Sequence, residues 1–107
     1  MSGTRPAVVR KMSSGKVIVR HKVQDFDKWK PIFLDDVKRQ REHGFTSWRI
    51  MRNKNDMNEV VVIFESNDVD KAKPMFSDPS LAELMKKAGV IDQPTIFMLV
   101  EAASGNL

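Results

Sequence analysis

The amino-acid sequence predicts one α+β domain whose strands and helices follow the order βαββαβ, with the strands in a four-stranded antiparallel sheet. Three observations support this prediction. Alternating apolar residues indicate strands, apolar residues repeated every three or four positions indicate helices, and Gly, Pro, Asn and Asp separate these segments. The 107 residues fit a single domain, and a domain of this length buries only about 60% of its unfolded surface. Because such a core is thin, we expect an oligomer.

Regular structure is expected to begin after residues 1–15, which mix Ser, Gly, Pro and basic residues and predict a flexible basic N-terminal arm. Residues 16–23 alternate and predict the first strand. One face of this strand is aliphatic except for a single imidazole and consists of Val17, Val19, His21 and Val23. The opposite face carries Ile18, Arg20 and Lys22. The first strand therefore has one side suited to a core.

Residues 27–43 predict the first helix. Asp25 or Asp27 can accept hydrogen bonds from the free amides at its start, and Gly44 can adopt the left-handed conformation that ends a helix. The apolar residues recur at a spacing of four, at Trp29, Phe33 and Val37. This spacing gives the helix one face that packs on a sheet.

Residues 45–52 and 59–65 predict the two strands of a hairpin. The first alternates, whereas the second is apolar on both sides in its middle, as expected of a central strand. The Asn and Asp residues between them, at positions 53–56, favour a turn because their side chains bond to their own backbone.

The second crossover is predicted to be a broken helix over residues 68–76 and 78–88. A proline interrupts its first half, and an Asp-Pro pair caps and restarts its second half. Residues 95–101 predict the last strand, and residues 102–107 a C-terminal tail that frays.

This order of elements is the ferredoxin-like arrangement, in which both helices cover one face of the sheet. The uncovered face is expected to mix aliphatic and charged residues, namely Ile18, Arg20, Lys22, Glu59, Val61, Ile63 and Glu65. A second copy of the same face would cover the aliphatic centre and pair the charges. We therefore predict a homodimer with two-fold symmetry.

The net charge of +4 does not belong to a folded face. Residues 1–20 carry five basic and no acidic residues, whereas the remainder carries thirteen basic residues against all fourteen acidic ones. A basic arm can contact phosphates without sequence preference, but its ordinary state is a solvated tail. We do not expect nucleic acid as a partner.

Other features narrow the class of protein. The absence of cysteine excludes disulfide bonds and thiolate metal sites. The apolar runs are far shorter than a membrane-spanning segment, and the first residues show no signal-peptide pattern. We therefore expect a cytoplasmic protein with no membrane partner.

Several short runs resemble the dimeric α+β barrel superfamily, which includes antibiotic-biosynthesis-type monooxygenases, polyketide cyclases and muconolactone isomerase-like proteins. The runs are residues 19–33, 64–66, 76–81 and 88–90. The first of them, VRHKVQDFDKWKPIF, is similar to the opening of small bacterial and archaeal members. The resemblance covers residues 16–101 and implies a dimeric α+β barrel domain with these boundaries, in a cyclase-like or antibiotic-biosynthesis-monooxygenase-like protein.

The resemblance also implies a site. Catalytic members bind an apolar, often aromatic ligand in a cleft between the sheet and its helices, and they use no metal or bound organic cofactor. Carried onto this chain, the cleft is walled by His21, Trp29, Phe33, Val62, Phe64, Phe76, Leu81 and Met85. The plant polyketide cyclase of the superfamily has a histidine near positions 78–81, but this chain has none there and no tyrosine anywhere. The His/Tyr acid–base pair of that enzyme is therefore not inherited.

His21 is the candidate catalytic residue. An imidazole on an aliphatic face is desolvated, which lowers its pKa and leaves a neutral ring able to take a proton from an activated C–H or phenol. The alternatives are a histidine hydrogen-bonded inside the core and one facing solvent. His43 is expected at the end of the first helix, where it interacts with the helix dipole. Because the two histidines flank one crossover, no metal site is predicted.

Three functions stay open. The chain is a cofactor-independent cyclase-, isomerase- or monooxygenase-like enzyme, a non-catalytic protein that binds a small apolar or aromatic molecule, or a structural or stress-related dimer. An oxygenase of this kind requires a readily ionised phenol or enol, because the substrate itself supplies the electron to oxygen. An empty pocket of a few hundred cubic ångströms beside His21 favours the first two functions, and a filled interior favours the third.

Overall fold

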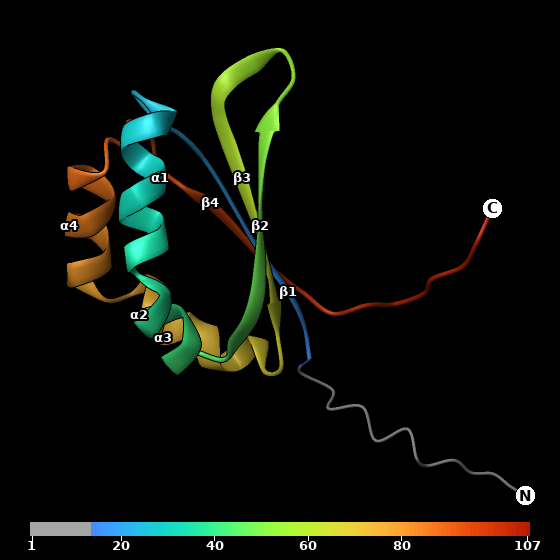
Figure 1. The fold of residues 1–107 in the computed structure, drawn as a ribbon. Helices are drawn as coiled ribbons and strands as arrows, with labels where there is room; N and C mark the ends of the chain where they lie inside the picture. Colours follow the sequence, from blue (N-terminus) through green and yellow to red (C-terminus); the bar gives the residue numbers. More distant parts are fainter. Residues whose placement is uncertain (1–13) are drawn as a thin grey trace, which may run out of the picture.

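The computed structural model describes residues 14–107, so the predicted basic arm lies almost entirely outside the described residues. Figure 1 shows the order of the elements. They are β1 (Gly15–Lys22), α1 (Phe26–Asp35), α2 (Val37–Glu42), β2 (Phe45–Asn53), β3 (Asp56–Ser66), the 3-10 helix η1 (Val69–Ala72), α3 (Lys73–Phe76), α4 (Pro79–Lys87) and β4 (Thr95–Leu99).

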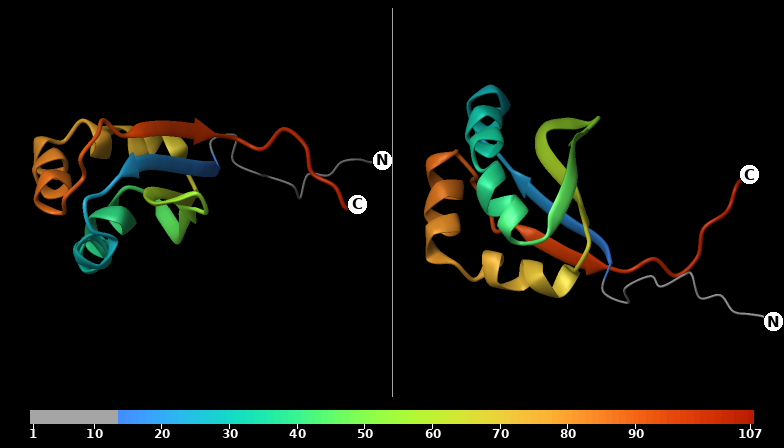
Figure 2. Two further views of the ribbon diagram at one scale, coloured as in Figure 1. Left: turned by 90° about the horizontal axis from the view of Figure 1, so that it is seen from above. Right: turned by 60° about the horizontal axis from the view of Figure 1, so that its bottom comes forward.

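The strands form one antiparallel sheet in the order β2-β3-β1-β4. Figures 1 and 2 show the helices gathered on one face of this sheet, while the other face carries no helix within the described part of the chain. The predicted ferredoxin-like α+β fold is therefore confirmed. None of the helices over residues 14–107 has the length and apolar character needed to cross a membrane.

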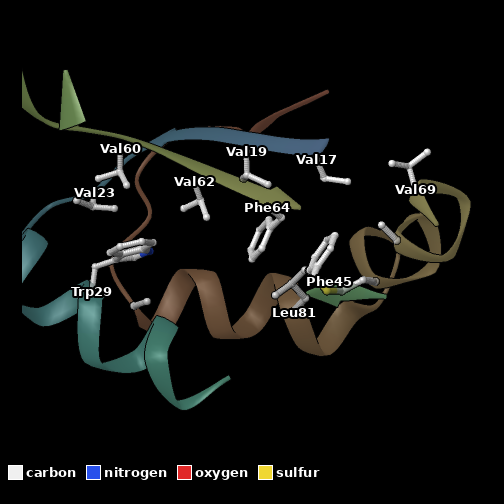
Figure 3. Packing of buried hydrophobic residues seen from close by; sticks show 13 residues of the cluster. Val17, Val19, Val23, Trp29, Phe45, Val60, Val62, Phe64, Val69 and Leu81 are labelled. Atoms are coloured by element: carbon white, nitrogen blue, oxygen red, sulfur yellow. The ribbon is translucent and has the colours of Figure 1, made fainter. Parts of the chain in front are cut away.

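The core lies between the sheet and the helices, as the alternation of β1 predicts. In the register of β1 and β3, Val17 is opposite Phe64, Val19 is opposite Val62, and His21 is opposite Val60. All six of these side chains are buried. Figure 3 shows the valines projecting from the sheet toward Trp29 and Leu81, which approach from the helices.

The prediction of one continuous helix over residues 27–43 is wrong, because the helix breaks at Asp36. The backbone of Asp36 leaves the helical conformation, and its amide donates to the carbonyl of Phe33, three residues back. Its carboxylate pairs with Arg39, 3.1 Å away, in the first turn of α2. The end of α2 agrees with the prediction, since Gly44 has a φ of 87°.

The second crossover is also more fragmented than predicted. Residues 69–72 form a 3-10 helix, and Pro74 lies at the start of the short helix α3 instead of interrupting a longer one. A proline is tolerated there because its missing amide has no partner in the first turn. The Asp78 cap of α4 is as predicted, and β4 is two residues shorter than predicted.

Candidate functional site

A cavity of about 50 Å³ lies between the covered face of the sheet and the helices. It is lined by all eight residues that the family resemblance assigns to a cleft, namely His21, Trp29, Phe33, Val62, Phe64, Phe76, Leu81 and Met85. Strands β1 and β3 supply three of these side chains, α1 supplies two, and α3 and α4 supply the rest. The structure thus brings together residues that are up to 64 positions apart in the sequence.

His21 is the one imidazole at this cavity, and its side chain is only 2% exposed. Its Nδ1 atom is buried without a hydrogen-bond partner among residues 14–107. The ring stands edge-on to Trp29, with the ring centroids 5.5 Å apart. Leaving a buried nitrogen without a hydrogen bond costs about 1–3 kcal/mol of stability. A water or a ligand that formed a hydrogen bond with this atom would remove that cost.

Burial lowers the pKa of His21 below its ordinary value of 6.5. Desolvation is the largest cause. A hydrogen bond to the backbone of His21 itself and the charge of Asp92 oppose the lowering of the pKa, and the charge of Arg20 adds to it. The imidazole is therefore neutral at pH 7, which is the form that accepts a proton.

One wall of the cavity is aromatic and packed ring on ring. Trp29 stacks on Phe33 with centroids 5.1 Å apart, Phe33 contacts Phe64 at 5.9 Å, and Phe64 stacks on Phe45 at 4.1 Å. The opposite wall consists of longer aliphatic and thioether side chains, namely Met75, Leu81, Leu84 and Met85. The aromatic wall is held in place by its own contacts, whereas the methionine side can adjust its shape.

Two polar residues of the cavity were missed by the sequence analysis. Gln40 is 5% exposed and donates its Nε2–H to the carbonyl of Phe33 at 3.4 Å, and Asp36 lies one turn before it. Both positions continue the helical stripe of Trp29 and Phe33, which is the signal that could have identified them. Gln40 supplies an amide beside a cavity that is otherwise almost entirely apolar.

His43 lies away from this cavity, as predicted. It ends α2, and its Nδ1–H donates to the carbonyl of Arg39 at 2.8 Å. No group of three or more metal-ligating side chains occurs within residues 14–107.

Comparison with solved structures identifies the fold. SnoaB, a cofactor-independent oxygenase from Streptomyces nogalater, superposes with a TM-score of 0.61 at 16% identity, over 84% of this chain and 96% of SnoaB. A structure described as an antibiotic biosynthesis monooxygenase matches with a TM-score of 0.61, over 82% of this chain and 98% of its own. It is also 16% identical.

A monooxygenase from the gene ActVA-Orf6 of Streptomyces coelicolor, solved in complex with nanaomycin D, covers 94% of this chain and 99% of its own length. Its TM-score is 0.60 and its identity is 20%. This chain has the ferredoxin-like fold of these monooxygenases. The fold that the resemblance implies is thereby confirmed. No family model matches the sequence, and no curated protein does either.

Proposed function

We propose that this chain is a cofactor-independent, monooxygenase-like enzyme that removes a proton from a small apolar or aromatic metabolite held beside His21. The observation that carries the proposal is the imidazole of His21 beside the cavity, whose buried Nδ1 has no hydrogen-bond partner among residues 14–107 and whose pKa is lowered by burial. The monooxygenase fold supports the same class of chemistry.

The proposed step begins with a phenol or enol whose ring packs on the aromatic wall of Trp29 and Phe33. The neutral imidazole of His21 accepts its proton, which leaves a phenolate or enolate and an imidazolium. The anion gives electrons to O₂, and a C–O bond forms at a ring carbon that carries hydrogen, which yields a peroxide. Burial opposes the imidazolium, so the ring readily returns its proton to the outer peroxide oxygen. The O–O bond and the C–H bond of that carbon then break, and hydroxide leaves with the C–H proton as one water, so that a phenol and O₂ give a quinone and water.

The proposed assembly is a homodimer formed through the uncovered face of the sheet. Its centre is apolar, because Ile18 pairs with Ile63 on one side and with Phe97 on the other. Phe97 is 50% exposed in the single chain. Around this centre the charges already pair within the chain, for example Arg20 with Glu59 at 2.6 Å and with Asp92 at 3.0 Å. A second copy would therefore cover the apolar centre and contact a surrounding rim whose charges are already paired within each chain.

One observation favours a second candidate, the structural dimer without turnover. A cavity of about 50 Å³ has room for a few waters, whereas sites for small organic ligands measure about 300–1,000 Å³. Binding of an aromatic metabolite by an enzyme therefore requires the cavity to enlarge, whereas a structural dimer functions with the cavity at its present size.

Two measurements on the full chain separate these functions. 2-Naphthol is added to the wild type and to His21→Ala, and oxygen consumption is followed with an electrode while the melting temperature is recorded. The enzyme predicts oxygen uptake in the wild type only, with a rise of melting temperature in both proteins. His43→Gln, which changes the histidine outside the cavity, serves as the control and is expected to keep the uptake.

A rise in melting temperature without oxygen uptake in the wild type would support the binding protein. If naphthols and single-ring phenols give neither signal, the structural dimer is favoured and the enzyme proposal fails.

A further inference from the structure

A second hollow lies directly outside the cavity. It is a groove of about 240 Å³ between α4, the loop over residues 88–94 and β4, and its outer lining includes Val90, Pro94 and Ile96. Three side chains line both the groove and the cavity, namely Phe76, Leu81 and Met85. The two spaces are therefore separated by a single layer of side chains.

We infer that this groove is the outer half of the ligand site and that the side chain of Met85 is the gate between the groove and His21. The inference rests on the proposed function for the identity of the ligand, a small aromatic phenol or enol. With the gate open, the cavity of about 50 Å³ and the groove of about 240 Å³ together approach the lower end of the range for small-molecule sites, about 300 Å³. The joined space thus removes the mismatch between the small cavity and an aromatic ligand.

Met85 is the member of this layer best suited to move. Leu81 is 7% exposed and belongs to the packed core, whereas Phe76 and Met85 are both partly buried at its edge. The ring of Phe76 is rigid and turns only as a unit, so Phe76 adapts its shape less than Met85 does. A methionine side chain is unbranched, and its three rotatable bonds let it take several shapes at small cost. Rotamer changes of exposed side chains take only about picoseconds to nanoseconds.

Movement of the whole helix α4 is a poorer explanation, because both of its ends are fastened. At its start, Arg39 of α2 bonds to the Asp78 carboxylate at 3.3 Å and to the Ser80 hydroxyl at 2.9 Å. After its end, the amide of Gln24 donates to the carbonyl of Gly89 at 2.8 Å, and the amide of Ile91 donates to that of Lys22 at 2.9 Å. Lifting α4 would break these bonds, whereas turning one side chain breaks none.

The mouth of the groove also has polar character. Lys86 and Gln93 line it, and the Asp92 carboxylate there is already held by Arg20 and by the backbone amide of Lys22. A ligand whose ring enters past Met85 would leave an acceptor substituent near Lys86 and Gln93.

The test uses Trp29, which lies in the cavity wall and is 3% exposed. In a Trp48→Phe background Trp29 is the only tryptophan, so acrylamide quenching of its fluorescence reports access to the cavity. We expect Met85→Ala to raise the quenching rate constant several-fold and Met85→Phe to lower it. Met75→Ala is the matched control, because Met75 lines the cavity but not the groove.

Equal quenching rate constants in the Met75→Ala and Met85→Ala proteins, or no change in either, would contradict the proposal that Met85 is a gate. If Met85→Ala does not fold, Met85→Leu keeps the volume of the side chain while stiffening it, and it is expected to slow quenching. Quenching does not depend on turnover, so the gate can hold in a protein that consumes no oxygen with 2-naphthol. Conversely, oxygen uptake together with unchanged quenching in every Met85 variant would support the enzyme proposal and contradict the role of Met85 as a gate.

Discussion

At the scale of the residue, His21 is a polar group placed where an aliphatic side chain would pack equally well. Its strand neighbours on the same face, Val19 and Val23, are buried valines, and it lies opposite another, Val60. The imidazole is desolvated without receiving a hydrogen bond at Nδ1 from any described residue. A residue that weakens the fold in this way is the kind that function retains.

The lowered pKa of His21 makes stability depend on pH in a predictable direction. Below pH 6.5 the unfolded chain takes up a proton on this ring while the folded chain does not, so the unfolded state is favoured as the pH falls. The free energy of unfolding should therefore fall by up to about 1.4 kcal/mol per pH unit from pH 6.5 down to the folded pKa. Urea unfolding between pH 7.5 and 5 measures it.

The comparison protein for this prediction is His21→Leu, which should lack that decline. Carboxylates with lowered pKa values, such as Glu59 and Asp92, lose their contribution only at more acid pH and do so in both proteins. Parallel stability curves for the two proteins above pH 5 would show that His21 does not titrate as the burial requires.

Two glycines are required by backbone geometry, since Gly44 and Gly89 have φ values of 87° and 88°. An L side chain in this region costs about 1–2 kcal/mol, so Gly44→Ala should lower the free energy of unfolding by that amount. At Gly44 the added methyl would also lie 3.2 Å from the Asn67 side chain. Gly105→Ala, which meets nothing within 4 Å, is the control and should change stability little.

At the scale of the element, the loop before β4 depends on one carboxylate. The Asp92 carboxylate accepts a hydrogen bond from the backbone amide of Lys22 at 2.7 Å and forms a salt bridge with Arg20 at 3.0 Å, so it fastens this loop to β1. The same contacts lower the pKa of Asp92, with the Lys22 amide as the first cause. This fastening also shapes the groove outside Met85.

Replacing this carboxylate tests the fastening. Asp92→Ala should speed hydrogen exchange at the Lys22 and Ile91 amides and lower stability by about 1 kcal/mol, since the site is partly screened by solvent. Asp92→Asn keeps an oxygen that can accept from the Lys22 amide and should exchange more slowly than Asp92→Ala. Identical exchange in all three proteins would mean that the backbone bonds alone hold the loop.

At the scale of the whole molecule, the uncovered face of the sheet presents apolar residues to solvent. Met51 and Phe97 are both about half exposed on this face, and the other sides of their strands carry partly buried residues, namely Ile50, Ile96 and Met98. Charged pairs surround them without covering them. A thin domain with such a face gains stability by covering it.

Light scattering at micromolar concentration should therefore give a particle with twice the 12.2 kDa mass of one chain. Phe97→Lys should shift this particle toward the single chain, because a charge at the centre of a buried face has no partner. Ile91→Lys introduces the same charge at an exposed residue outside the strands and should leave the mass unchanged. A wild-type particle of 12.2 kDa would contradict the dimer.

Much of the fold was predictable because its signals are local. The alternation of residues 16–23 assigned the buried face of β1, and Gly44, which has left-handed geometry, marked the end of the first helical segment. The resemblance then grouped eight residues that the structure places around one cavity. Their roles in binding and catalysis are still predictions.

What the sequence by itself determined about this protein is which residues of β1 turn inward and that α2 ends before Gly44, because the period of a strand and the conformation of a glycine depend on near neighbours. Only the tertiary structure decided the break at Asp36, the 50 Å³ size of the cavity and the position of the groove beside it. These features depend on how closely segments distant in the sequence approach one another. Such distances result from the packing of all the side chains together, and no local pattern encodes them.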